Sequence, residues 1–150
     1  MTIRVLNPGE HPPMELLLLA DPSEELVRAY VARGDCYVME REGEAVGVYV
    51  LLPTRPDTVE LVNVAVAEPL HGQGIGKALV LHAVRQAREL GYKTMEVGTG
   101  STGVAQLALY QKCGFRMTGI DRDFFIRHYR EPIYENGMQL FDMVRMAQDL

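Results

Sequence analysis

One segment of the chain, residues 64–79, reads as a strand, a glycine-rich turn and the start of a helix. Glycines occupy positions 72, 74 and 76 of the turn. A residue without a Cβ tolerates positive φ and lets backbone N–H groups come close to a ligand. The helix that follows directs its unpaired N–H groups and the positive end of its dipole back at the turn. The segment therefore predicts an anion site, and phosphate is the usual anion.

Two common phosphate-binding patterns do not fit this turn. The P-loop pattern G-x-x-x-x-G-K-[ST] fails because His71 replaces its first glycine and Ala78 follows Lys77. The dinucleotide pattern G-x-G-x-x-G fails because the spacing here is G-x-G-x-G, with no clear acidic residue after a second strand. The remaining structural alternative is a turn that uses three glycines only to reverse the chain sharply.

Composition limits the classes of protein that the chain can belong to. A length of 150 residues, 47% of them hydrophobic, suits one domain over residues 1–150 with one core. A net charge of −5 argues against a nucleic-acid partner. There is no apolar run of about 18 residues and no signal-peptide pattern, so we expect no membrane partner and a cytoplasmic location. Cys36 and Cys113 lack metal-ligand spacing, and we expect no metal.

Hydrophobic periodicity and turn residues divide the chain into alternating elements. Strands are expected at residues 2–6, 37–41, 45–52, 59–67, 94–97, 115–120 and 138–146. Helices are expected at residues 12–20, 24–33, 74–90 and 104–112, and loops at 53–57 and 121–137. In the strand at 59–67, simple alternation puts Val59, Leu61 and Ala65 on one face and Val62, Val64 and Val66 on the other. The helix at 74–90 presents a buried stripe of Leu79, Ala83, Ala87 and Leu90.

The glycine turn resembles the pyrophosphate loop of the GCN5-related N-acetyltransferases, the GNAT superfamily. Its pattern [QR]-x-x-G-x-[GA] corresponds to residues 71–76, with His71 in place of Gln or Arg. A second segment, LALYQKCGF at residues 107–115, is similar to the family's A-x-x-L-Y-x-x-x-G-F segment. Residues 123–129 and 135–137 resemble a bacterial branch of this superfamily. The resemblance implies the GNAT fold, an α/β (α+β) arrangement with a mixed, mostly antiparallel sheet, a central βαβ unit and helices on both faces.

The resemblance also implies an activity, the transfer of an acetyl group from acetyl-CoA to a primary amine by direct attack. In the family, a backbone N–H of the strand before the loop donates to the thioester oxygen, and the resemblance assigns this N–H to Val66. It assigns to Val64 the backbone that pairs with the pantetheine arm of the cofactor. In the family, an Asn before the fourth helix often contacts the cofactor arm. In this chain Ser101 is the expected substitute for that Asn. The expected cofactor-binding residues are Val64, Val66, His71, Gly72, Gln73, Gly74, Ile75, Gly76, Lys77 and Ser101.

Candidate catalytic residues follow from what the reaction needs. Departure of the CoA thiolate is helped by a general acid, and Tyr110 matches the family's tyrosine in that role. The alternative for Tyr110 is a side chain half-buried at a helix edge. The amine must lose a proton, and Glu60 is the first candidate for its acceptor, ahead of Glu96 and His128. A solvated strand end is the alternative for Glu60.

The acceptor site is expected to include four side chains and a covering loop. Asn63 interrupts an apolar strand, where it either steadies a bulge or touches substrate. The loop at residues 121–137 is expected to cover the acceptor side. The substrate-binding candidates are Asn63, Glu96, Phe124 and His128.

Three classes of function remain open from the sequence. The first is an N-acetyltransferase acting on a small-molecule amine, or on protein N-termini or lysines. The second is a non-catalytic regulator that binds acyl-CoA, and the third is an interaction module whose glycines only make turns. A homodimer through the C-terminal strand is a further expectation.

Overall fold

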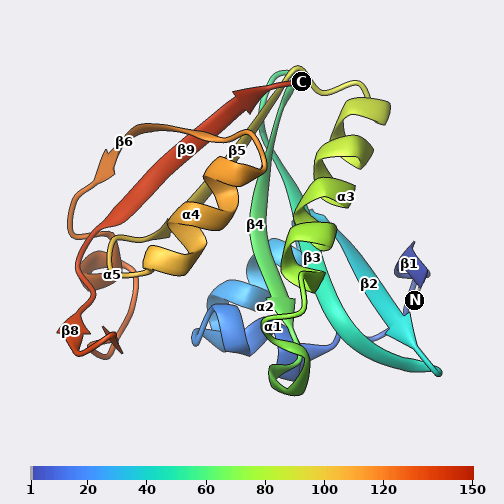
Figure 1. Cartoon of the computed structure of the whole chain (residues 1–150), viewed down its shortest axis with the longest axis horizontal. Helices are drawn as coiled ribbons and strands as arrows, with labels where there is room; N and C mark the ends of the chain where they lie inside the picture. The colour runs from blue at the N-terminus through green and yellow to red at the C-terminus, as the bar shows by residue number, and fades with distance from the viewer. Residues whose placement is uncertain (1) are drawn as a thin grey trace.

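The computed structural model describes residues 2–150 and contains one seven-stranded sheet with helices on both faces (Figure 1). The strands lie in the order β1-β2-β3-β4-β5-β9-β6, and β7 and β8 form a separate two-stranded ladder. The strands are β1 (Thr2–Val5), β2 (Asp35–Arg41), β3 (Glu44–Arg55), β4 (Thr58–Val66), β5 (Thr94–Gly100), β6 (Arg116–Asp121), β7 (Tyr134–Glu135), β8 (Met138–Gln139) and β9 (Met143–Asp149). The helices are α1 (Met14–Ala20), α2 (Glu24–Arg33), α3 (Ile75–Glu89), α4 (Val104–Lys112) and α5 (Phe124–Arg127), with a 3₁₀ turn η1 (Glu68–Leu70).

The sheet is antiparallel except at its centre, where β4 and β5 run parallel and α3 connects them. One hydrophobic cluster joins this sheet to α3 and α4, and a second joins it to α1 and α2. The two pairs of helices therefore cover opposite faces, as Figure 1 shows. The predicted mixed sheet with a central βαβ unit and helices on both faces is confirmed. Among residues 2–150, no helix has both the length and the apolar content of a membrane span.

A bulge in β4 changes which side chains share a face. In the register with β3, Asn63 pairs with Val50 and Leu61 pairs with Leu51, so Val62 has no partner. An extra residue of this kind reverses the alternation beyond it. Val64 and Val66 accordingly pack with the α3 cluster, and Ala65 packs with the α1–α2 cluster. The face assignment predicted from simple alternation is therefore wrong for the residues after Val62.

The two central strands separate halfway along β4. Residues 58–61 of β4 pair with residues 94–97 of β5, and the ladder then ends. β5 continues to Gly100 alongside β9. Figure 1 shows β4 and β5 diverging away from the end of the sheet where the C-terminus lies. The second half of β4 therefore has an edge that faces a gap in the sheet.

Among the predicted boundaries that differ from the structure, two concern β3 and α3. β3 continues through the expected loop at residues 53–57 as far as Arg55, where it still pairs with Thr58. Leu90, expected in the buried stripe of α3, is 51% exposed because the helix ends at Glu89 and the chain turns away from the sheet. Val80 and Val84 complete the buried stripe instead.

The C-terminal region also differs from the prediction. The expected loop at 121–137 contains α5 and β7, and the expected strand at 138–146 is split into β8 and β9. β9 pairs with β5 on one side and β6 on the other. Residues 143–147 of β9 therefore lie between two strands and offer no free edge to a second copy of the chain, whereas Gln148 and Asp149 pair with β5 alone.

Candidate active site

The glycine turn ends in the open N-terminus of α3. Gly72 and Gly74 have φ values of +80° and +79°, a left-handed conformation that favours glycine. Gly74 is the N-cap of α3, and no side chain caps the helix. The first backbone bond of the helix runs from the Ala78 N–H to the Gly74 carbonyl. The N–H groups just before Ala78 are therefore free to bind an anion at a helix of 15 residues.

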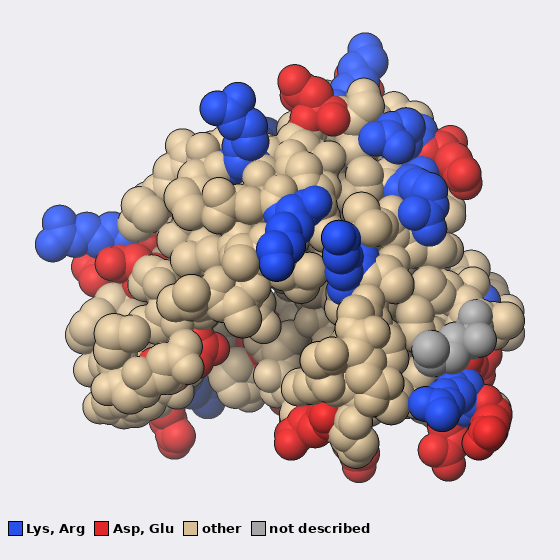
Figure 2. All heavy atoms as spheres, in the orientation of Figure 1, with Lys and Arg blue, Asp and Glu red and all other residues tan. Residues whose placement is uncertain are grey.

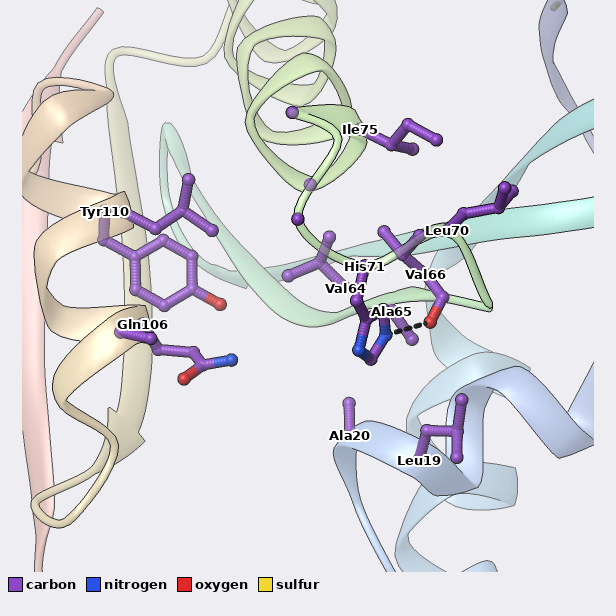
Figure 3. Close-up of a pocket in the computed structure, with 15 residues that line it drawn as sticks. Leu19, Ala20, Val64, Ala65, Val66, Leu70, His71, Ile75, Gln106 and Tyr110 are labelled. Atoms are coloured by element: carbon purple, nitrogen blue, oxygen red, sulfur yellow. Dashed lines mark hydrogen bonds between the residues drawn. The ribbon is translucent and has the colours of Figure 1, made fainter. Parts of the chain in front are cut away.

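His71 ties this turn to the end of β4. Its Nε2 lies 2.6 Å from the carbonyl oxygen of Val66 (Figure 3). A carbonyl oxygen can only accept, so Nε2 carries the proton in this bond. The histidine that departs from the family's loop pattern thus has a local structural role.

The backbone of β4 presents polar groups to the gap in the sheet. The Ala67 N–H donates to the Val46 carbonyl at 2.9 Å, across the ladder with β3. Bonded and non-bonded pairs alternate along an antiparallel ladder. Val64 and Val66 are therefore non-bonded with β3 and direct their N–H and C=O groups away from it. On that side β5 has already separated from β4.

A cavity of about 360 Å³ occupies this gap, between the glycine turn and α4. Figure 2 shows that the face of the molecule with α3 and α4 is hollowed near its middle, with Lys and Arg side chains beside the hollow. The cavity is lined by Leu19, Ala20, Val64, Ala65, Val66, Leu70, His71, Gly72, Gly74, Ile75, Gly76, Ala105, Gln106, Leu109 and Tyr110.

Tyr110 projects from α4 into this cavity. The residue is 5% exposed, and its hydroxyl points toward Val64 and His71 (Figure 3). Its ring packs edge-on against Phe115, with centroids 5.9 Å apart. Burial raises the pKa of the Tyr110 hydroxyl above its usual range, and the nearby Cys113 thiol adds to this effect. The Tyr110 hydroxyl therefore keeps its proton at neutral pH.

A second cavity of about 550 Å³ opens on the opposite face of the sheet. Its floor includes Glu60, Gly98 and Arg145, which alternate along their strands with the residues that pack beneath α3. Residues of α1 and α2 line one side, and Phe124, Phe125 and other residues of the segment after β6 line the other. The two cavities share Leu19, Ala20, Val64, Gln106 and Tyr110. Two molecules could therefore enter from opposite faces and meet beside Tyr110.

The family model described as "Acetyltransferase (GNAT) family" matches residues 7–115 of the chain. The chain belongs to the GNAT family of acetyltransferases. It is 57% identical over 136 residues to the uncharacterized N-acetyltransferase YvbK of Bacillus subtilis, covering 91% of this chain and 88% of that protein.

Solved structures of acetyltransferases match this one over nearly its whole length. A GNAT family acetyltransferase from Elizabethkingia anophelis with acetyl-CoA bound has a TM-score of 0.97 and 43% identity, covering 99% of this chain and 97% of the other. A Bacillus subtilis acetyltransferase in complex with CoA has a TM-score of 0.90 and 54% identity, with the same coverage. The protein is therefore a GNAT N-acetyltransferase.

Glu60 lies within the second cavity of this acetyltransferase, whereas Glu96 lies outside it and pairs with Arg55. The Glu60 side chain is 18% exposed, and its Oε2 lies 3.6 Å from Arg145 Nη1. Burial raises the pKa of Glu60, the Arg145 guanidinium lowers it and the Glu96 carboxylate raises it further. Glu96 accepts a hydrogen bond from Arg55 and does not line either cavity. Glu60 thus remains the better placed of the two predicted carboxylates.

Asn63 holds the bulge of β4 against α1 and α2. Its Nδ2 donates to the Leu17 carbonyl at 3.0 Å and to the Tyr30 hydroxyl at 2.8 Å. The residue is 4% exposed, and its Oδ1 is buried with no hydrogen-bond partner among residues 2–150. Of the two predicted roles, this geometry favours the steadying of the bulge.

Several predicted site residues lie outside both cavities. Gln73 and Lys77 are exposed around the helix mouth, and Ser101 is exposed with its N–H bonded to the Asp142 carbonyl. His128 packs its ring on Phe124, with centroids 4.6 Å apart, and faces the protein surface rather than the second cavity. Phe124 alone of this pair lines the second cavity.

Gln106 and Arg145 are polar lining residues that the sequence did not predict. Gln106 lines both cavities one helical turn before Tyr110, a spacing of four residues that places both on one side of α4. Arg145 lies on β9, and its distance in sequence from every other site residue left no local signal. Among residues 2–150, no group of three or more His, Cys, Asp and Glu side chains is placed to share a metal ion.

Proposed function

We propose that the protein transfers the acetyl group of acetyl-CoA to the primary amine of a small molecule, by direct attack of the amine on the thioester. The observation that carries this proposal is the junction of the two cavities at Val64 and Tyr110. Acetyl-CoA would occupy the cavity beside the glycine turn, and the amine would enter from the opposite face.

The cofactor would bind mainly to backbone groups. The free N–H groups at the start of α3 suit the pyrophosphate of CoA, which carries negative charge at neutral pH. The outward-facing backbone of Val64 suits hydrogen bonds with the amide groups of the pantetheine arm. The Val66 N–H would face the thioester oxygen, and one such donor typically stabilises the transition state by about 2.7–4 kcal/mol.

Two side chains would move the protons. Glu60, with its raised pKa, would accept a proton from the incoming ammonium, and the neutral amine would then attack the carbonyl carbon. The C–S bond breaks as the new C–N bond forms. Tyr110 would give its proton to the departing thiolate. The proton that the amine nitrogen loses then restores the tyrosine through solvent.

The shape of the second cavity supports a small molecule over a protein chain as the acceptor. Side chains from α1, α2 and residues 124–145 surround it on several sides, which leaves room for a compact ligand. Protein N-termini and lysines remain the alternative acceptors, since both present primary amines.

An acceptor screen tests the proposal. Acetyl-CoA is incubated with the protein and a panel of amines, amino acids and short peptides, and free CoA thiol is measured. We expect thiol release that depends on a small amine. Release with peptides alone would favour protein acetylation. Tight acetyl-CoA binding in calorimetry without any release would favour a non-catalytic regulator and contradict the proposal.

A further inference from the structure

Arg145 lies on the floor of the second cavity, between two glycines. It pairs with Gly98 of β5 on one side and with Gly119 of β6 on the other. A Cβ added to Gly98 would clash first with the Met143 side chain and would also come within 3.3 Å of Arg145 Nη1. The missing side chain at Gly98 therefore makes room for Met143 and for the guanidinium, which lies across the sheet on an arginine side chain that is 34% exposed.

The guanidinium is oriented by its neighbours but not saturated by them. Among residues 2–150 its one hydrogen bond runs from Nη2 to Asp121 Oδ2, at 3.4 Å. The 3.6 Å separation from Glu60 is an ion pair without a hydrogen bond, and the Phe124 ring lies 5.4 Å from Cζ. A guanidinium has five N–H donors in a rigid fork. Arg145 therefore keeps donors for a further acceptor within the cavity.

Two of the cavity's carboxylates, unlike Glu60, are already occupied. Asp21 accepts hydrogen bonds from the hydroxyls of Tyr30 at 3.0 Å and Tyr129 at 2.9 Å. Glu135 accepts one from Thr102 at 2.8 Å. Apart from Arg33, which lines the cavity from α2, the charges left to meet a ligand are, on the floor, the carboxylate of Glu60 and, beside it, the guanidinium of Arg145.

This pair is complementary to a molecule that carries an amine and a carboxylate close together. The amine would approach Glu60, and the carboxylate would take two parallel hydrogen bonds from the fork of Arg145. Around this pair the cavity is lined by apolar side chains that include Leu26, Leu52 and Phe125. They would receive an apolar side chain of the same ligand.

We propose that the acceptor is an α-amino acid, or a close analogue, with an apolar side chain, and that Arg145 binds its carboxylate. This inference rests on the proposed function, because it assumes that the acceptor amine meets acetyl-CoA beside Glu60. To the proposed function, the inference adds Arg145 as the group that selects among acceptor amines.

The test uses pairs of compounds that differ only in charge. Leucine, methionine and phenylalanine are each compared with their carboxamides as acceptors, by thiol release. In the unaltered enzyme we expect kcat/KM to favour the free acids by about tenfold to a hundredfold, as for loss of one charge-assisted pair. Arg145→Gln should remove this preference, mainly through KM, and Arg145→Lys should restore only part of it, because lysine lacks the planar fork.

A matched control and a second readout keep the outcome clear. Arg116→Gln, an exposed change on β6, should leave the preference intact. The N-acetylated amino acids and their amides are also titrated calorimetrically into the protein loaded with CoA, a measurement that needs no turnover. The inference would be overturned if Arg145→Gln and the unaltered protein showed the same ratio of acid to amide, both in rates and in binding. Absence of turnover together with acid-selective binding that Arg145→Gln abolishes would support it while rejecting the proposed function.

Discussion

The side-chain nitrogen of Asn63 lies 2.8 Å from the hydroxyl of Tyr30, which in turn lies 3.0 Å from the carboxylate of Asp21. This chain of hydrogen bonds links the bulge of β4 to α2 and to the residue that follows α1. Burial raises the pKa of Tyr30, so the hydroxyl stays protonated and donates to Asp21. The point where the sheet opens is thus held by a buried polar network.

Asn63→Ala should destabilise the fold more than it impairs recognition of the amine. The substitution removes two donors and leaves the Leu17 carbonyl without this partner, at a cost of about 1–3 kcal/mol. Denaturant unfolding measures the loss. Unchanged stability together with a large rise in KM for the amine would show that Asn63 contacts substrate instead.

Tyr110→Phe should lower turnover by about a hundredfold to ten-thousandfold, the usual range for a general acid. The phenyl ring keeps the edge-on packing against Phe115, so acetyl-CoA affinity should stay nearly the same. Single-turnover kinetics and calorimetric titration separate these two effects. Tyr134→Phe, at an exposed position on β7, is the control. Full activity of the Tyr110 variant with chemistry rate-limiting would exclude the acid role.

Gly74→Ala and Gly43→Ala form a pair with the same backbone strain in two places. Gly74 and Gly43 have φ values of +79° and +81°, and a Cβ at either would meet open space. Each substitution should cost about 1–2 kcal/mol of stability, because L-residues are strained in the left-handed region. Only Gly74→Ala should also weaken acetyl-CoA binding, since it alters the mouth of α3. Equal affinity in both variants, measured by calorimetry, would place the pyrophosphate elsewhere.

The pH profile should report Glu60. A base must be deprotonated, so activity should fall as the pH drops through the pKa of Glu60, which lies above the ordinary value of 4.5 because burial disfavours the charged form. Glu60→Gln should remove this acidic limb and reduce kcat. Arg145→Gln should move the limb to higher pH, because Arg145 lowers the Glu60 pKa. An acidic limb that is identical in the Glu60 variant would assign the base to another group.

Local features of the chain were predictable because the sequence specifies them over short distances. The strand, the three glycines and the helix after them lie within residues 58–89, and their backbone requirements appear directly in the residue types. Tyr110 could be placed because its motif is continuous. The family and the βαβ unit followed from these segments together.

Other features depended on contacts between distant parts of the chain. The sequence offered Glu60 and Glu96 as near equals. Only the fold paired Glu96 with Arg55 and buried Glu60 beside Arg145, which is 85 residues away by their numbers in the chain. The bulge at Val62 likewise shows only in the register with β3, where it reverses the faces of Val64 and Val66. Short-range preferences thus determined the elements and the loop, whereas the tertiary structure decided which charged side chains share the second cavity, because burial and pairing arise only when distant strands come together.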